Sequence, residues 1–173
     1  MTIKKLLIAN RGEIASRIIS SAHDMGISCV AIYTEADKDT PYVREADQAF
    51  KLSDSYLNSK EILDIALKSN SDAIHPGYGF LSENAAFANQ VKKLNIKWVG
   101  PSSNAIKKMG DKLTAKEIAI KANVPTLPMT SDPKKANSIG YPILVKAAAG
   151  GGGKGMRIVE KAKDLKELSL IHI

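Results

Sequence analysis

Short apolar runs and segments of helical periodicity alternate through the first hundred residues, and this alternation restricts the fold more than any other feature of the sequence. Residues 3–9 are mostly apolar, residues 12–25 repeat apolar side chains on one helical face, and residues 29–33 are apolar again. Gly26 stands where the helix would end. A strand, a helix and a second strand in this order are typical of a parallel βαβ unit.

The same alternation continues to about residue 100. Three further strands and two helices are expected, at residues 49–52, 59–68, 72–75, 82–94 and 96–99. Ser59 and Ser82 are the expected N-caps of the two helices, because a serine hydroxyl accepts a hydrogen bond from an otherwise unpaired N–H. The sequence therefore predicts an α/β fold, a doubly wound, Rossmann-like parallel sheet, whose ligands would bind beyond the carboxyl ends of the strands.

A change of pattern near residue 102 predicts a domain boundary, with one domain at residues 1–102 and the start of another at 103–173. One or two helices are expected before Val124-Pro125, and a short helix is expected to begin at Pro133 and to end at Gly140. Two strands at residues 142–148 and 156–159 and a helix at residues 161–170 follow.

The net charge of +7 is confined to the second part of the chain. Residues 1–103 hold 12 basic and 12 acidic residues, whereas residues 104–173 hold 13 basic and 6 acidic residues. The bases are scattered and few aromatic residues lie among them, which argues against a nucleic-acid surface. An anionic ligand such as a polyphosphate explains the excess as well as a solvated basic surface does.

Targeting and redox signals are weak in this sequence. No apolar run approaches membrane-spanning length, and the apolar part of the N-terminus is too short for a signal peptide. The single cysteine, Cys29, lies in an apolar stretch and is interpreted as a small core residue rather than a nucleophile. No membrane association and a cytoplasmic location are the resulting expectations.

A glycine-rich segment separates the last two predicted strands. It comprises Gly150, Gly151, Gly152, Gly153, Lys154 and Gly155. A P-loop is excluded because Ala148 replaces its first glycine and Gly155 its hydroxyl residue, and a strand rather than a helix follows. What remains is a hairpin whose bare backbone N–H groups can approach phosphate oxygens and whose tip can act as a lid. The alternative is a flexible surface hairpin.

Lys146 strengthens the interpretation as a phosphate site. Strand alternation places Lys146 on the same face as Leu144 and Ala148, and a buried lysine there would need an anion. A lysine on an edge strand, or one that extends its ammonium to water, is the alternative. Lys112 is less informative alone, because a lysine on a basic helix is usually solvated.

Four blocks of sequence together resemble one family. They cover residues 8–15 with Arg17, residues 73–84, residues 99–101 with 109–112, and residues 140–156. In order and spacing, over roughly residues 3–167, the chain is similar to the N-terminal part of biotin carboxylase, the ATP-grasp component of biotin-dependent carboxylases. Residues 103–173 would then begin the ATP-grasp domain.

The resemblance implies a ligase reaction. ATP and bicarbonate would form carboxyphosphate, and its carboxyl group would pass to biotin on a biotin carboxyl carrier protein. Magnesium, a carboxyltransferase partner and a homodimer of the longer parent protein are implied as well. The parent would be an acetyl-CoA carboxylase of fatty acid biosynthesis, a propionyl-CoA carboxylase or a pyruvate carboxylase, and the sequence leaves this choice open.

Site residues follow from the resemblance by position. Lys112 and Lys146 would contact ATP, and Gly152 and Gly153 would close over its phosphates as part of the lid from Gly150 to Gly155, which includes Gly151 and Lys154. Tyr78 and Gly79 would lie near the biotin pocket. Lysines and backbone donors suit phosphoryl transfer, which depends on charge stabilisation more than on covalent chemistry.

The family's magnesium-binding carboxylates, its bicarbonate-binding residues and its biotin-contacting arginine lie beyond residue 173. The chain is therefore expected to be a fragment that holds no catalytic or metal-ligating residue and is inactive alone, and residues 104–173 are expected to be poorly stable. Lys154 stands where the family can carry arginine, which keeps the charge.

Three other functions remain open. Another ATP-grasp ligase, of the carbamoyl-phosphate synthetase or purine-pathway type, shares the lysines and the lid, although residues 75–84 favour the biotin enzymes. A noncatalytic nucleotide-binding module and a nucleic-acid binder are the others. A hydrogen-bonding role is favoured for His75 over general base catalysis, whereas Arg11, Glu13 and Glu83 fit a turn, an interface or a substrate contact equally.

Overall fold

The computed structural model of the chain describes residues 2–146 and 156–165. These fall into two units, Met1–Asp111 and Lys112–Ile173, which are described separately. The glycine-rich residues 150–155 and residues 166–173 lie outside the described part. No helix of the described part is long and apolar enough to cross a bilayer.

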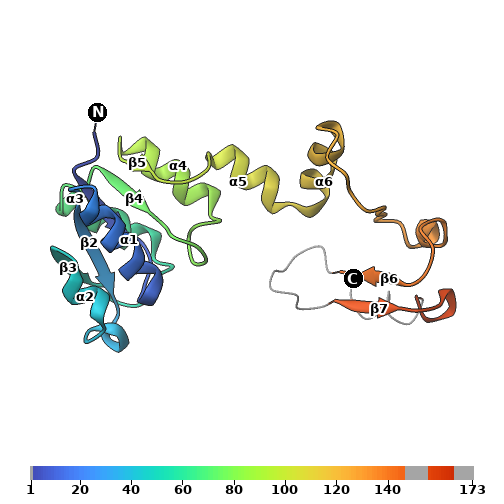
Figure 1. Cartoon of the computed structure of the whole chain (residues 1–173), viewed down its shortest axis with the longest axis horizontal. Coiled ribbons are helices and arrows are strands. Elements are labelled where there is room, and N and C mark those ends of the chain that lie inside the picture. The colour runs from blue at the N-terminus through green and yellow to red at the C-terminus, as the bar shows by residue number, and fades with distance from the viewer. Residues whose placement is uncertain (1, 147–155, 166–173) are drawn as a thin grey trace. The chain divides into compact units, whose positions relative to one another are not determined.

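A five-stranded parallel sheet forms the centre of the first unit (Figure 1). Its strands are β1 (Lys5–Ile8), β2 (Ser28–Tyr33), β3 (Gln48–Lys51), β4 (Ala73–His75) and β5 (Lys97–Trp98). Their order is β3-β2-β1-β4-β5, so the chain winds in one direction from β1 to β3 and in the other through β4 and β5. Leu7 pairs with Val30 of β2 on one side and with Ile74 of β4 on the other. The predicted doubly wound sheet is confirmed, and β1, β4 and β5 are shorter than expected.

Helices cover both faces of the sheet. Helices α1 (Gly12–Asp24) and α2 (Pro41–Glu45) cover one face, and α3 (Ser59–Lys68), α4 (Ala85–Lys93) and α5 (Ser103–Gly110) the other. Strand alternation explains the division: Leu6 and Ile8 of β1 pack against α1, whereas Leu7 packs with the helices of the opposite face. The sequence did not predict α2 or the short 3-10 helix η1 (Glu35–Asp37) that precedes it.

Both expected serine N-caps are wrong. Asn58 caps α3, because its side-chain oxygen accepts a hydrogen bond of 3.2 Å from the Glu61 N–H, and Ser59 is the first helical residue. Asn84 caps α4 in the same way through the Phe87 N–H at 2.9 Å. Ser82 lies in the preceding turn, where its N–H donates to the Gly79 carbonyl oxygen. Asparagine caps as well as serine does, so backbone geometry decides between neighbouring candidates.

Helix α5 extends the first unit beyond residue 102. Its Ile106 is buried in the same core cluster as Phe87 of α4 and Trp98 of β5. The rings of Phe87 and Trp98 meet edge to face, with 5.6 Å between centroids. The first unit consequently runs to Asp111, whereas the sequence placed the domain boundary near residue 102.

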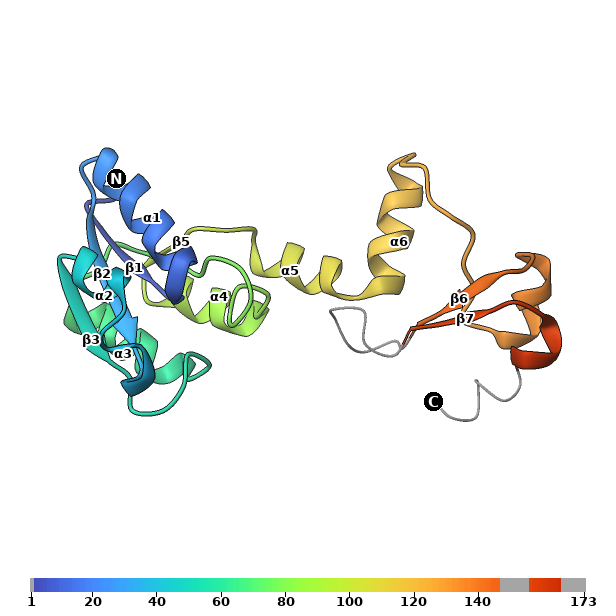
Figure 2. The same ribbon diagram turned by 60° about the horizontal axis from the view of Figure 1, so that its bottom comes forward.

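The described part of the second unit contains one longer helix, a hairpin and two 3-10 helices (Figure 2). They are α6 (Lys112–Lys121), η2 (Pro133–Ser138), β6 (Ile143–Val145), β7 (Arg157–Val159) and η3 (Ala162–Asp164). Strands β6 and β7 are antiparallel, and Leu144 pairs with Ile158, which confirms the predicted strand pair. Asp132 caps η2 by accepting from the Lys134 N–H at 2.9 Å, with Pro133 at its first position as predicted. Of the helix predicted at residues 161–170, the structure describes residues 161–165, which contain η3 and the helical Leu165.

Candidate functional site

The carboxyl ends of β1 and β4 meet at the point where the winding of the sheet reverses, and Asn10 joins them. Asn10 lies two residues after the end of β1 and is fully buried. Its side-chain NH2 group donates to the carbonyl oxygens of Pro76 at 2.7 Å and Tyr78 at 2.9 Å, and its side-chain oxygen accepts from the Arg11 N–H. One amide therefore fixes the whole turn that follows β4. The sequence offered a signal for Asn10, a polar residue directly after an apolar strand, but the prediction missed its role.

Gly77 makes this close approach possible. Its φ of +62° lies in the left-handed region, and a Cβ on Gly77 would come within 2.7 Å of Asn10 Nδ2 and 2.8 Å of Ile14 Cγ2. Gly79 also has a positive φ, of +69°, but open space surrounds the position of its Cβ. The turn thus needs glycine at residue 77 for space as well as for conformation.

His75 ends β4 and stabilises the same turn. Its Nδ1 accepts a hydrogen bond of 3.0 Å from the Gly77 N–H, so the proton of the neutral ring is on Nε2. Burial lowers the pKa of His75 below its ordinary value of 6.5, which favours this neutral form. This geometry gives His75 the structural hydrogen-bonding role that the sequence analysis favoured.

A buried carboxylate orders the loop after β2. Asp37 is 3% exposed and binds the Arg11 guanidinium through both of its oxygens, with 2.8 Å from Arg11 Nε to Asp37 Oδ2. Tyr56 donates its hydroxyl to the same Oδ2 at 2.6 Å. The hydrogen bonds from Arg11 hold the pKa of Asp37 below its ordinary value of 3.8. Arg11, left open by the sequence, therefore has a structural role, and Asp37 and Tyr56 were missed because their partners are distant in sequence.

Tyr78 and Gly79, the predicted biotin-pocket residues, lie on the exposed rim of this edge. The Tyr78 side chain is 58% exposed, and its hydroxyl donates to Glu13 Oε1 at 2.9 Å. The other oxygen of Glu13 accepts from Arg17 Nε at 2.8 Å. The hydrogen bond to Glu13 raises the pKa of Tyr78. The rim thus offers an aromatic ring and nearby charges to a ligand, and Glu13 belongs to it.

The predicted ATP-binding lysines belong to the second unit. Lys112 is the first residue of α6, and Lys146 directly follows β6. Both are exposed. Ile143 and Val145 are half-buried, whereas Leu144 and Lys146 are exposed, so Lys146 lies on the open face of the hairpin rather than in an apolar interior. This geometry leaves its ammonium accessible to an anionic ligand. The predicted lid, residues 150–155, lies outside the described residues.

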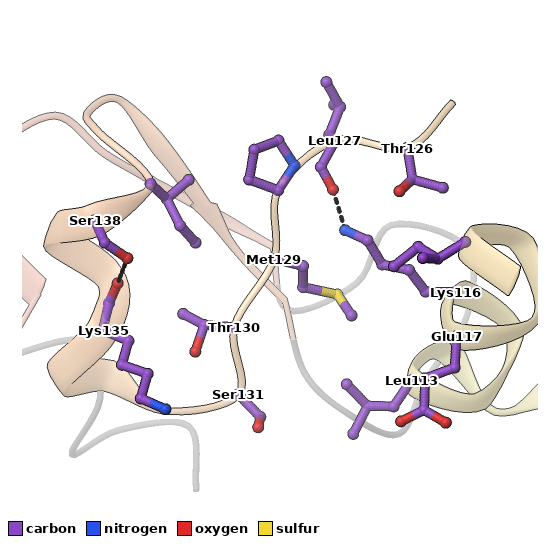
Figure 3. Close-up of a pocket in the computed structure, with 13 residues that line it drawn as sticks. Leu113, Lys116, Glu117, Thr126, Leu127, Met129, Thr130, Ser131, Lys135 and Ser138 are labelled. Atoms are coloured by element: carbon purple, nitrogen blue, oxygen red, sulfur yellow. Dashed lines mark hydrogen bonds between the residues drawn. The ribbon is translucent and has the colours of Figure 1, made fainter. Parts of the chain in front are cut away.

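An open pocket of about 720 Å³ lies between α6 and η2 in the second unit (Figure 3). The extended residues 126–131 form one of its walls, and across it Lys116 donates a hydrogen bond to the Leu127 carbonyl oxygen. Neither Lys112 nor Lys146 lines it. The pocket is therefore distinct from the residues that the sequence assigned to ATP.

Two family models match the chain in succession. The biotin carboxylase N-terminal domain matches residues 2–106, and the ATP-binding domain of the carbamoyl-phosphate synthase L chain matches residues 111–171. Together they divide the chain close to the junction between α5 and α6.

The curated proteins with similar sequences include a biotin carboxylase and a subunit of a methylcrotonoyl-CoA carboxylase. Biotin carboxylase 1 of Bacillus subtilis is 49% identical over 94% of this chain and 39% of its own length. The methylcrotonoyl-CoA carboxylase subunit alpha of Dictyostelium discoideum is 48% identical over 95% of this chain and 26% of its own length. The chain thus spans well under half the length of these relatives.

Solved structures agree with the sequence comparisons. The biotin carboxylase of Campylobacter jejuni, described as a β-γ-ATP complex, has a TM-score of 0.93 at 44% identity, over 99% of this chain and 41% of its own. The biotin carboxylase domain of the Hydrogenobacter thermophilus 2-oxoglutarate carboxylase, with MgADP and bicarbonate, has a TM-score of 0.91 at 42% identity, over 96% of this chain and 40% of its own. The chain therefore belongs to the biotin carboxylase family.

Proposed function

We propose that the protein to which this chain belongs is a biotin carboxylase, a ligase that uses ATP and bicarbonate to carboxylate biotin on a carrier protein. The observation that carries the proposal is the succession of the two family matches, a biotin carboxylase N-terminal domain followed by an ATP-binding domain. Relatives named as biotin carboxylases over the same residues support it. Bicarbonate would attack the terminal phosphorus of ATP, which releases ADP, and the carboxyl group of the resulting carboxyphosphate would pass to a biotin nitrogen as phosphate leaves.

Lys112 and Lys146 would bind the phosphates of ATP. Lysine ammonium groups stabilise phosphate oxygens as point charges, and the exposed face that carries Lys146 leaves room for a ligand. Residues 150–155 would donate backbone N–H groups to the same phosphates. Tyr78 and Gly79 would face biotin from the rim of the first unit. These assignments rest on position in the family together with the exposure of Lys112, Lys146 and Tyr78.

Magnesium accompanies the nucleotide in one of the similar structures, which is described with MgADP. Within residues 2–146 and 156–165, the metal-ligating side chains that gather in a group of three are His23, Cys29 and Asp47. A thiol and an imidazole do not suit a hard cation that prefers oxygen ligands, so this set does not fit magnesium. We propose that residues outside this chain hold it.

The partners proposed for the whole protein are a biotin carboxyl carrier protein, a carboxyltransferase and a second copy of the biotin carboxylase. Its acyl substrate would be set by the carboxyltransferase, with acetyl-CoA, propionyl-CoA and pyruvate carboxylases as the candidates. The relatives include pyruvate and methylcrotonoyl-CoA carboxylases, so an assignment to fatty acid biosynthesis is one proposal among several. A cytoplasmic location stays a prediction.

The test is biotin- and bicarbonate-dependent ATP hydrolysis by the complete protein that carries this chain. Lys146→Gln should lower kcat/KM for ATP by roughly 10- to 100-fold, since a hydrogen bond to a charged group contributes about 1.5–3 kcal/mol. Lys121→Gln is the matched control, because Lys121 is an exposed lysine in the last turn of α6 with no assigned role.

The alternatives predict other results. ATP hydrolysis that needs ammonia or glutamine instead of biotin would replace the proposal with a ligase of the carbamoyl-phosphate synthetase type, as the second family match allows. Nucleotide binding without hydrolysis under any of these conditions would indicate a noncatalytic module. Equal effects of Lys146→Gln and Lys121→Gln would contradict the assignment of Lys146 while leaving the reaction intact.

A further inference from the structure

Three metal-ligating side chains meet at the amino end of the sheet, opposite the Asn10 turn. His23 lies in the last turn of α1, Cys29 is the second residue of β2, and Asp47 directly precedes β3. One nitrogen, one sulfur and one oxygen atom from these residues lie within 4.8 Å of one another. Parallel strands bring the three segments together, because their amino ends share one edge of the sheet.

Asp47 organises this cluster. Its Oδ2 accepts the Cys29 N–H at 2.7 Å and lies 3.0 Å from His23 Nε2. The hydrogen bond from the Cys29 backbone and then the one from His23 lower the pKa of Asp47, so its carboxylate is ionised at neutral pH. The carboxylate is thus held in place by the backbone N–H of Cys29, the same residue that carries the thiol.

The cluster has an open side and a closed side. The side chains of His23 and Asp47 are 41% and 48% exposed, whereas Cys29 is fully buried. The Cys29 sulfur has only weak partners, the Ile27 carbonyl oxygen at 3.7 Å and the Ile19 carbonyl oxygen at 4.0 Å. An ion would therefore reach the sulfur from the side of the two exposed polar groups, once the side chains of His23 and Asp47 turn toward it.

The donor set selects the kind of ion. Zinc binds sulfur at about 2.3 Å and nitrogen or oxygen at about 2.0–2.2 Å, which in a tetrahedron separates the ligand atoms by roughly 3.5 Å. The three ligand atoms already lie within 4.8 Å of one another, so small rotations of the His23 and Asp47 side chains would be needed to reach this spacing. A cysteine must lose its proton to bind a metal, so the Cys29 thiol favours a cation with high affinity for sulfur. Magnesium and calcium are disfavoured for the same reason.

We propose that His23, Cys29 and Asp47 bind one divalent cation of the zinc class, with water at the fourth position. The bound ion links α1, β2 and the start of β3 and so stabilises the first unit. Its place at the amino end of the strands separates it from the carboxyl edge, where Asn10 and Tyr78 lie. The site therefore acts on stability rather than on the proposed reaction, and its test is independent of that reaction.

Cadmium titration of the 173-residue chain tests the proposal, because a cadmium–thiolate bond has its own ultraviolet absorption band and Cys29 is the single cysteine. We expect the band to saturate at one ion per chain, and zinc to compete for the site and to raise the thermal unfolding midpoint. His23→Asn and Asp47→Asn should each weaken binding by at least about 10-fold. Loss of a residue that merely hydrogen-bonds a metal ligand already lowers metal affinity by about 10- to 100-fold, and loss of a ligand should cost no less. Cys29→Ala should abolish the band.

The control is His172→Asn, which removes a histidine near the end of the chain and should leave the titration unchanged. Circular dichroism verifies that each variant is folded. His23 is exposed at a helix end, so its variant keeps the test valid if Asp47→Asn unfolds. The absence of a thiolate band in the folded chain would overturn the proposal in favour of a hydrogen-bonded cluster. A band whose affinity in both His23→Asn and Asp47→Asn equals that of the wild type would overturn it in favour of a lone thiol.

Discussion

The Asn10 side-chain amide occupies the space beside Gly77 that a methyl group would need, since a Cβ on Gly77 would lie 2.7 Å from Asn10 Nδ2. The same amide donates to the carbonyl oxygens on either side of Gly77, those of Pro76 and Tyr78. A side chain at residue 77 would therefore push away the group that holds the turn in place.

Gly77→Ala should destabilise the first unit far more than Gly26→Ala. Both glycines have a positive φ, of +62° and +70°, and this conformation costs alanine about 1–2 kcal/mol at either position. Of these two positions, only at Gly77 would the added Cβ also clash, with Asn10 and Ile14. Overpacking of this kind lowers the free energy of unfolding by roughly a further 1–3 kcal/mol. Urea unfolding of both variants measures the difference. Equal losses of stability would show that the space beside Gly77 is not restricted.

Asp37→Asn should lower the free energy of unfolding by about 2–3 kcal/mol, because it removes the charged acceptor of Arg11 and Tyr56. Glu35→Gln is the control. Glu35 also pairs with two lysines, Lys38 and Lys51, but all three side chains are more than half exposed, so its loss should hardly change stability. Urea midpoints of the two variants at neutral pH measure both effects.

Acid should remove the contribution of Asp37 in the wild type. The folded-state pKa of Asp37 lies below its ordinary value of 3.8, so the stabilisation is complete above that value and is lost as the pH falls through the folded-state pKa. Wild type and Asp37→Asn should therefore converge in stability in strong acid. A constant difference between them down to about pH 2 would contradict the ionised role of Asp37.

His75→Asn should flatten the dependence of stability on pH in the weakly acidic range. Burial lowers the folded-state pKa of His75 below 6.5, so the unfolded chain binds a proton first and stability falls as the pH drops through about 6.5. The asparagine oxygen can still accept the Gly77 N–H but does not titrate in this range. Thermal midpoints measured from about pH 8 to pH 5 should converge for the two proteins at the acidic end. Parallel profiles would show that His75 is protonated equally in both states.

Backbone amides from α6 to η3 should exchange with solvent faster than those of the β1–β4 core. In the described part of the second unit, the buried hydrophobic side chains are Ala136 and Val159, whereas the first unit has two core clusters. Little buried apolar surface means a low free energy of local opening. Helix α5 should be protected with the first unit, because Ile106 is part of its core. Hydrogen exchange measured by mass spectrometry tests both expectations, and slow exchange in α6 would contradict them.

Periodicity alone was sufficient to predict the five strands of the first unit and its longer helices, because most of these elements contain an apolar run or an apolar helical face. It was not sufficient for α2, whose five residues are fewer than two helical turns. It also misplaced both helix caps, since Asn58 and Ser59 are adjacent residues of equal capping ability. Local pattern therefore predicted elements well and their ends poorly.

The candidate site was predictable only in part. Tyr78, Gly79, Lys112 and Lys146 were selected by resemblance, and their roles stay predictions. The contacts that shape the edge were missed because they join residues far apart in sequence: Asn10 and Pro76 are separated by 66 positions, and Arg11 and Asp37 by 26. A sequence shows that a buried polar group needs a partner but does not show which residue supplies it.

The bridge from Asn10 to the turn after β4 also limits how the protein can be engineered. Surface loops usually accept inserted residues, tags or new chain ends. Here one amide must reach two carbonyl groups that flank a single glycine, so the spacing between His75 and Tyr78 admits no extra residue. A circular permutation or a grafted peptide at this turn would separate the ends of β1 and β4, although the turn lies at a sheet edge where such changes are ordinarily made.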